Sequence, residues 1–291
     1  MASPTPTVGQ WALKIPYAHD NFLQTYDVYL VDQPAVPSST VEPAEKIWFI
    51  YIHGGFFRDV LVDSASLHPA VSLLTATAAA DSSVQKNIAG FASLNYRLSP
   101  SAKVPQDPST PAFDLRAAVW PQHLDDVCAG IRHLQAAFSF GANYILAGHS
   151  VGATVALLAA IKGKQSHGII PPKAVLGLSG IYDFPLLHES HPEYEALTFN
   201  AMKRGEEVAA SPAIYDVQTY KEAGVSQVLL AHSKDDGLVP WNQVEAMETV
   251  LVPGGEGYVR VLELFGKHNQ IWADGTELSR AVTAAVESLV A

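Results

Sequence analysis

A serine between two glycines is the residue of this chain whose surroundings most clearly suggest covalent chemistry. The segment is Gly148-His-Ser-Val-Gly152, which matches the pattern G-x-S-x-G. It follows the short apolar run Tyr144 to Ala147 and precedes a segment rich in Ala and Leu, so a sharp strand-to-helix turn is expected there. Such a turn lifts the hydroxyl out of the sheet and places it at a helix N-terminus, which favours negative charge. Ser150 is therefore predicted to be a nucleophile.

A serine hydroxyl is a weak nucleophile at neutral pH and needs a base. His268 lies in Phe265-Gly-Lys-His-Asn269, after the last predicted strand and before the final predicted helix. It is also the only histidine after His232. We predict that His268 is the base, the alternative being an ordinary exposed loop histidine.

Two neighbouring carboxylates could orient that base. Both lie in His232-Ser-Lys-Asp-Asp-Gly-Leu-Val-Pro240, which begins at the end of another predicted strand. When a serine sits on this kind of turn, the acid follows it in the chain and the histidine follows the acid. Asp236 is preferred because Asp-x-x-Val-Pro is a familiar form of the acid loop, and Asp235 would then be a solvated neighbour.

Backbone amides for a developing oxyanion are expected at a pair of glycines. The segment His53-Gly54-Gly55-Phe56-Phe57 ends the first strongly apolar strand, and its glycines leave N–H groups free to point at an oxyanion. The predicted donors are the N–H groups of Gly55, Phe56 and Val151, while His53 is expected to organise the loop. The alternative is a tight turn that merely needs glycine.

The remaining sequence predicts the elements that would position these groups. Strands and helices alternate, which implies a mostly parallel sheet covered by helices on both faces. We expect a single domain over residues 1–291, with a loop at Gln33 to Glu45 and a lid-like insertion at 181–220, which is polar, irregular and long. The strands are expected within Trp11 to Val31 and at Lys46 to His53, Gly90 to Tyr96, Tyr144 to Ala147, Lys173 to Ser179, Gln227 to His232 and Tyr258 to Leu264. The helices are expected at Ala65 to Ala80, Pro121 to Phe138, Gly152 to Lys162 and Trp272 to Val290.

Charge and composition argue against several classes of function. The net charge of −11 and the pI near 5.4 disfavour nucleic acid and anionic membrane surfaces as partners. The segment Met1 to Gln10 lacks the pattern of a signal peptide, and no apolar run is long enough to span a bilayer, so the cytoplasm is the expected location. No metal-ligand spacing or nucleotide-binding glycine motif is present, so neither a metal nor another cofactor is expected. Cys128, the single cysteine, is expected to be a buried thiol.

Taken in chain order, the motifs resemble the esterase and lipase branch of the α/β-hydrolases that carries an HGG loop. Within that branch the chain resembles the fungal kynurenine formamidases, also called arylformamidases. The segments that carry the resemblance are Tyr51-Ile-His-Gly-Gly55, Tyr96-Arg-Leu-Ser-Pro100, Gly148-His-Ser-Val-Gly-Ala-Thr154, Gly180-Ile-Tyr182, His191-Pro-Glu-Tyr194, His232-Ser233 with Asp236, and His268-Asn269. One position departs from the family, because Phe57 stands where its HGG-x-Trp motif has tryptophan.

The resemblance implies a serine hydrolase that releases formate from N-formyl-L-kynurenine, a small-molecule substrate of tryptophan degradation. It is also compatible with a homodimer. Phe56, Phe57, Tyr182, Phe184 and Trp241 could form an aromatic pocket for such a substrate, or could simply pack in the core or the insertion. Two other functions use the same sequence features: a carboxylesterase for small esters, and a non-catalytic binding protein on a hydrolase scaffold.

Overall fold

An eight-stranded sheet forms the centre of the molecule. A computed structural model describes residues 4–32, 46–76, 79 and 82–290, so the loop predicted at Gln33 to Glu45 lies outside the described residues. The strand order is β1-β2-β4-β3-β5-β6-β7-β8. The first two strands form an antiparallel hairpin that joins β4 antiparallel, and every later pairing is parallel. The predicted mostly parallel α/β sheet is confirmed.

The strands lie close to their predicted positions. The hairpin is formed by β1 (Trp11–Pro16) and β2 (Thr25–Leu30) within the expected edge segment. The parallel strands are β3 (Ile47–Ile52), β4 (Ile88–Leu94), β5 (Tyr144–His149), β6 (Ala174–Leu178), β7 (Gln227–Ser233) and β8 (Val259–Leu264).

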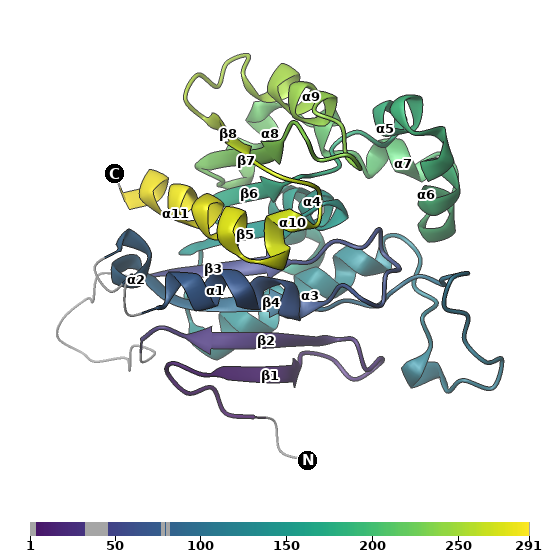
Figure 1. Ribbon diagram of the computed structural model, residues 1–291, viewed down its shortest axis with the longest axis horizontal. Coiled ribbons are helices and arrows are strands. Elements are labelled where there is room, and N and C mark those ends of the chain that lie inside the picture. Colours follow the sequence, from purple (N-terminus) through teal and green to yellow (C-terminus); the bar gives the residue numbers. More distant parts are fainter. Residues whose placement is uncertain (1–3, 33–45, 77–78, 80–81, 291) are drawn as a thin grey trace.

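Each face of the sheet has its own apolar core, which explains why the central strands are apolar on both sides. In β3, Trp48, Ile50 and Ile52 point into one core, while Ile47, Phe49 and Tyr51 point into the other. The first core is covered by α3 (Gln122–Phe138), α4 (Val151–His167), α8 (Val217–Ala223) and α9 (Asn242–Leu251). The second is covered by α1 (His68–Leu74), α2 (Ser83–Asn87), α10 (Gln270–Ala273) and α11 (Thr276–Val290), the helices in front of the sheet in Figure 1.

Three of the predicted helices were wrong in extent. The helix expected at Gly152 to Lys162 is α4, which continues to His167. The helix expected over Ala65 to Ala80 begins as a 3-10 turn, η1 (Ser64–Leu67), and its α-helical part ends at Leu74. The C-terminal helix is divided into α10 and α11 at Gly275, which has a φ of +80°. A Cβ atom on Gly275 would overlap the backbone of Ala70 in α1, so the close packing of the two segments requires glycine there.

The segment 181–220 contains several short helices between β6 and β7. They are α5 (Phe184–Ser190), η4 (Pro192–Tyr194), α6 (Glu195–Ala201), α7 (Glu206–Ala209) and η5 (Pro212–Ile214), with α8 at its end. In Figure 1, α5, α6 and α7 project beyond the sheet at the upper right. A further short turn, η3 (Ala112–Asp114), lies in the long connection after β4.

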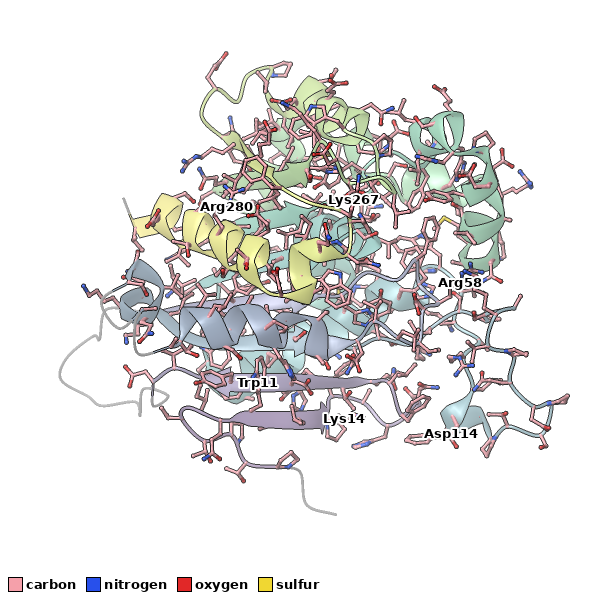
Figure 2. The ribbon with its side chains drawn as sticks, viewed as in Figure 1. Trp11, Lys14, Arg58, Asp114, Lys267 and Arg280 are labelled. Carbon is pink, nitrogen blue, oxygen red and sulfur yellow. The ribbon has the colours of Figure 1, made fainter. Side chains whose placement is uncertain are left out.

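The aromatic ring of Trp11 shows how the edge hairpin attaches to the helical layer. Trp11 of β1 stacks on His68 of α1, with 3.9 Å between the ring centres, and so ties the edge hairpin to the helical layer (Figure 2).

Cys128 of α3 is fully buried, and burial raises the pKa of its thiol to about 12, so it is an unreactive core residue. Among the described residues, no helix is both long and apolar enough to cross a membrane.

Candidate active site

Ser150 lies at a strained turn between β5 and α4. Its φ of +56° and ψ of −127° are unusual for a residue with a side chain, and only 5% of its surface is exposed. The turn is fixed by its own backbone, because the N–H of Ser150 donates to the carbonyl of Leu178 at 2.8 Å. A Cβ on Gly148 would overlap the backbone of Gly152, and a Cβ on Gly152 would overlap the carbonyl oxygens of Ile52 and His53. The two glycines of the motif are therefore steric requirements.

His268 and Asp236 meet beside this turn. The Nδ1–H of His268 donates to both carboxylate oxygens of Asp236, at 2.9 and 2.8 Å, and both side chains are buried. The backbone N–H of His268 also donates to the carbonyl of Asp236 at 2.9 Å. Asp235 is exposed, and its backbone N–H donates to the hydroxyl of Ser233. Of the two candidate acids, Asp236 is the one that orients His268.

The Asp236 carboxylate is held in its charged form. Burial alone would raise its pKa, but the hydrogen bond and charge of His268, together with the N–H of Val239 at 2.8 Å, outweigh that effect and lower the pKa to about 2. The N–H of Leu238 donates to the same oxygen at 3.0 Å. Since a carboxylate can only accept, Nδ1 of His268 carries a proton and its Nε2 is available as a base.

The HGG segment forms a loop of unusual backbone geometry after β3. Gly55, Phe56 and Phe57 all have positive φ values, of +93°, +47° and +63°. The loop is held by the carbonyl of Gly55, which accepts from the N–H of Arg58 at 3.0 Å and of Asp59 at 2.9 Å. Residues with side chains adopt such angles only when the surroundings impose them, and strain of this kind is concentrated at functional sites. The N–H of Val151, in the first turn of α4, has no acceptor within its helix.

His53 supports this loop from behind. Its Nδ1–H donates to the carbonyl of Gly54 at 2.9 Å, and its ring stacks on that of Tyr96 at 4.5 Å. The hydroxyl of Tyr96 donates to the carbonyls of His53 and Gly54 at 3.1 Å. Burial lowers the pKa of His53 to about 4, so the ring is neutral at pH 7. This arrangement agrees with an organising role for His53.

His149, the second residue of the serine motif, contacts the base directly. Its Nε2–H donates to the backbone carbonyl of His268 at 3.1 Å, and the centres of the two rings are 4.5 Å apart. Burial and the neighbouring His268 lower the pKa of His149 well below its ordinary value. The neutral ring therefore links the serine turn to the loop that carries the base.

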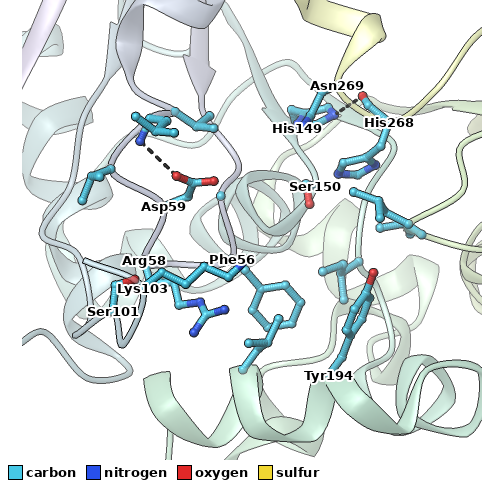
Figure 3. A pocket seen from close by; sticks show the side chains of 18 of the residues that line it. Phe56, Arg58, Asp59, Ser101, Lys103, His149, Ser150, Tyr194, His268 and Asn269 are labelled. Atoms are coloured by element: carbon cyan, nitrogen blue, oxygen red, sulfur yellow. Dashed lines mark hydrogen bonds between the residues drawn. The ribbon is translucent and has the colours of Figure 1, made fainter. Parts of the chain in front are cut away.

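A cavity of about 440 Å³ is lined by Ser150, His268, His149, Gly55 and Phe56. Ser150 and His268 lie beside each other on its wall, as Figure 3 shows. In the part of the chain that the structure describes, no hydrogen bond joins the hydroxyl of Ser150 to another residue. Such nucleophile–base contacts are often loose before substrate binds. The predicted nucleophile, base, acid and HGG loop are thus gathered at the carboxyl ends of β3, β5, β7 and β8.

Of the five aromatic side chains that could have formed a pocket or packed in the core, four pack in or against the core. Phe56 lines the cavity, but Phe57 is fully buried against His123 and Trp120, with ring centres 4.5 and 6.0 Å away. Tyr182 and Phe184 are also fully buried, and Trp241 packs edge-on against His232. The turn at Gly55 to Phe57 directs the second aromatic ring into the core, so the family's tryptophan position is a core position here.

Several lining residues were not predicted from the sequence to lie in the site. They come from three segments that are distant in the chain: the turn after the HGG motif, the connection after β4, and the insertion. They include Arg58, Asp59, Ser101, Lys103, Ile181, Tyr194 and Leu197. Arg58 and Leu197, a residue of α6, line the same cavity. The one signal in the sequence for these lining residues was the charged pair Arg58 and Asp59, directly after the HGG loop.

A strained serine beside a histidine held by a buried carboxylate, with backbone amides close by, is an arrangement that can transfer acyl groups. The family described as alpha/beta hydrolase fold matches residues 49–271, and the chain belongs to that family. Within it, the chain belongs with the kynurenine formamidase-like hydrolases.

Three fungal relatives support that narrower placement. A kynurenine formamidase-like hydrolase of Fusarium equiseti, fscH, is 33% identical over 282 residues, covering 91% of this chain and 90% of that protein. The kynurenine formamidase avaC of Aspergillus versicolor is 32% identical, covering 89% of this chain and 94% of that protein. A kynurenine formamidase of Meyerozyma guilliermondii is 28% identical, covering 93% of this chain and 92% of that protein.

Solved structures of esterases share the fold. A truncated carbohydrate esterase from gut microbiota superposes with a TM-score of 0.62 at 18% identity, covering 99% of this chain and 98% of that one. Esterase B of Lactobacillus rhamnosis gives a TM-score of 0.65 at 15% identity, covering 96% and 85%. The chain is thus a hydrolase related to kynurenine formamidases and esterases.

Proposed function

We propose that the protein is a serine hydrolase that cleaves the formamide of N-formyl-L-kynurenine to give L-kynurenine and formate. The observation that carries the proposal is the pairing of His268 with buried Asp236 beside the strained Ser150. The kynurenine formamidases among the relatives support the choice of substrate. A cavity of about 440 Å³ is also in the range of small-molecule sites.

In the acylation step, the hydroxyl oxygen of Ser150 attacks the formyl carbon while Nε2 of His268 takes its proton. Asp236 keeps the imidazole in the required tautomer and stabilises its charged form. The N–H groups of Gly55, Phe56 and Val151 stabilise the oxyanion, each contributing on the order of 3 kcal/mol. His268 then protonates the aniline nitrogen, the C–N bond breaks and kynurenine leaves a formyl ester on Ser150.

In the deacylation step, water attacks the formyl ester while His268 takes a proton from it. The second tetrahedral intermediate collapses, His268 returns the proton to the oxygen of Ser150, and formate is released. An arylamine leaves more readily than an alkylamine, so the machinery of an esterase suffices for this amide.

The insertion at 181–220 would act as the lid of this site. It contributes Ile181, Tyr194 and Leu197 to the cavity wall, and the ring of Tyr194 meets that of Phe56 edge-on at 5.8 Å. These contacts place apolar groups beside the expected aryl ring of the substrate.

Formate release from N-formylkynurenine by the wild type and by Ser150→Ala tests the proposal. We expect turnover by the wild type and almost none by the variant. Turnover of p-nitrophenyl acetate without deformylation would instead favour the carboxylesterase. A fluorophosphonate probe that labels the wild type but not Ser150→Ala would exclude a purely binding function, whereas failure to label either would support it.

A further inference from the structure

Two basic side chains line the cavity without an acidic partner. Arg58 follows the HGG loop and Lys103 comes from the connection after β4. Within the described part of the chain, neither the guanidinium nor the ammonium group makes an ion pair or a hydrogen bond. The chain as a whole has 29 acidic and 18 basic residues, so a cavity with two unpaired cations runs against its general charge. Such cations are suited to bind an anionic group of a ligand.

These cations lie at the end of the cavity away from the base. Figure 3 shows Arg58, Asp59, Ser101 and Lys103 on one side and His268 on the other, with Ser150 and Phe56 between them. A ligand whose reacting carbonyl is at Ser150 can therefore extend past the ring of Phe56 towards the charged side chains.

A carboxylate lies at the same end. Asp59 is exposed and lines the cavity, and its Oδ1 accepts the N–H of Leu61 at 3.0 Å. Arg58 and Asp59 belong to one turn, since both of their N–H groups donate to the carbonyl of Gly55. Charges of both signs thus stand next to each other at this end of the cavity, which matches a zwitterion better than a simple anion.

We propose that Arg58, Lys103 and Asp59 form a subsite for the α-amino-acid group of the substrate. Arg58 and Lys103 bind its carboxylate, and Asp59 binds its ammonium group. The inference rests on the proposed function, because N-formylkynurenine joins an aryl formamide to such a group. Lys103 and Asp59 are exposed to solvent, so each contact is expected to be moderate, worth about tenfold in kcat/KM.

The test compares two aryl formamides that differ only in the amino-acid group, namely N-formyl-L-kynurenine and ortho-formamidoacetophenone. The measured quantity is the ratio of their kcat/KM values, which cancels any general loss of active enzyme. Arg58→Gln and Lys103→Gln should each lower this ratio about tenfold, and Arg58→Glu should lower it further. Asp59→Asn keeps an oxygen for the N–H of Leu61 and should also lower the ratio. Arg260→Gln and Lys164→Gln change basic residues outside the cavity lining and serve as controls.

A wild-type ratio near one, or a ratio that Arg58→Gln and Lys103→Gln leave unchanged, would overturn the subsite. If the wild type hydrolyses neither formamide, the proposed function fails, and the cationic half of the subsite is tested with meta-acetoxybenzoate against phenyl acetate. A preference for the anionic ester that is lost in Arg58→Gln would support the cationic end. Equal rates with the two esters would reject the cationic end of the subsite as well.

Discussion

Replacing Asp236 by Asn probes the link between the buried carboxylate and the base. The amide oxygen can still accept the N–H groups of Leu238 and Val239, so the loop keeps its turn. The amide NH₂ group then occupies the position of Oδ2, 2.8 Å from Nδ1 of His268, so the Nδ1–H faces a donor there and keeps only a neutral acceptor, the amide oxygen 2.9 Å away. The ring loses its counter-charge, and the repulsion at Nδ1 favours the tautomer with the proton on Nε2, which can no longer take the proton of Ser150.

The expected loss is large in rate and modest in stability. An imidazole in the wrong tautomer and without its counter-charge lowers kcat by about 10³- to 10⁴-fold, or about 4 to 5 kcal/mol of transition-state stabilisation. The pKa of Asp236, about 2 against an ordinary 3.8, corresponds to about 2 kcal/mol of folding free energy at pH 7. The variant should therefore melt several degrees below the wild type and yet remain folded at 25 °C.

The assay is formate release at saturating substrate, together with a thermal melt followed by circular dichroism. Asp235→Asn is the matched control, because Asp235 is the adjacent, exposed carboxylate, and it should behave like the wild type in both measurements. The reasoning is refuted if folded Asp236→Asn keeps more than about a tenth of the wild-type kcat. It is equally refuted if Asp235→Asn loses as much activity as Asp236→Asn.

Three further predictions concern the same site. A carboxylate whose pKa is lowered by folding stabilises the folded state above its unfolded pKa, so about 2 kcal/mol should be lost as the pH falls from about 5 to 2. Urea unfolding at several pH values measures this loss, and Asp236→Asn should show correspondingly less of it. Gly152→Ala puts a methyl group against the carbonyls of Ile52 and His53, so a clear drop in Tm and at least a hundredfold loss of formate release are expected. His149→Phe keeps a ring but removes the hydrogen bond to the carbonyl of His268, so kcat should fall about tenfold. His149→Gln, which retains a donor, should recover part of the activity, and equal rates for the two variants would contradict this role.

The sequence was sufficient to locate functional residues wherever their positions depend on local backbone geometry and chain order. Ser150 could be located because its turn requires glycines at fixed positions, and His268 because it is the histidine that follows the last strand. The alternation of strands and helices predicted a parallel sheet. Its strands could be located because a buried parallel strand must be apolar on both faces. The Asp-x-x-Val-Pro pattern favoured Asp236 over Asp235, and the structure distinguishes the two by burial.

The cavity wall could not be predicted, because it depends on where loops from distant segments meet. Phe57 was a candidate for the wall, yet three successive positive φ values turn its ring into the core. Helix α9 was missed because Trp241, the residue at its N-cap position, makes no side-chain capping hydrogen bond. Arg58 and Lys103 are 45 residues apart in the sequence, and nothing in either segment indicates that they share a cavity.

The turn from Gly55 to Asp59 carries both an amide expected at the oxyanion and two of the charged side chains at the far end of the cavity, Arg58 and Asp59. Its carbonyl at Gly55 accepts two hydrogen bonds, so the span between these two points is fixed by a few residues of backbone. Such a turn sets the distance between the amide and the charged side chains. Under the proposed subsite, substrates would be selected by the length between their reacting carbonyl and their charged end. A substrate analogue longer or shorter by one methylene group would then reach only one of the two sites.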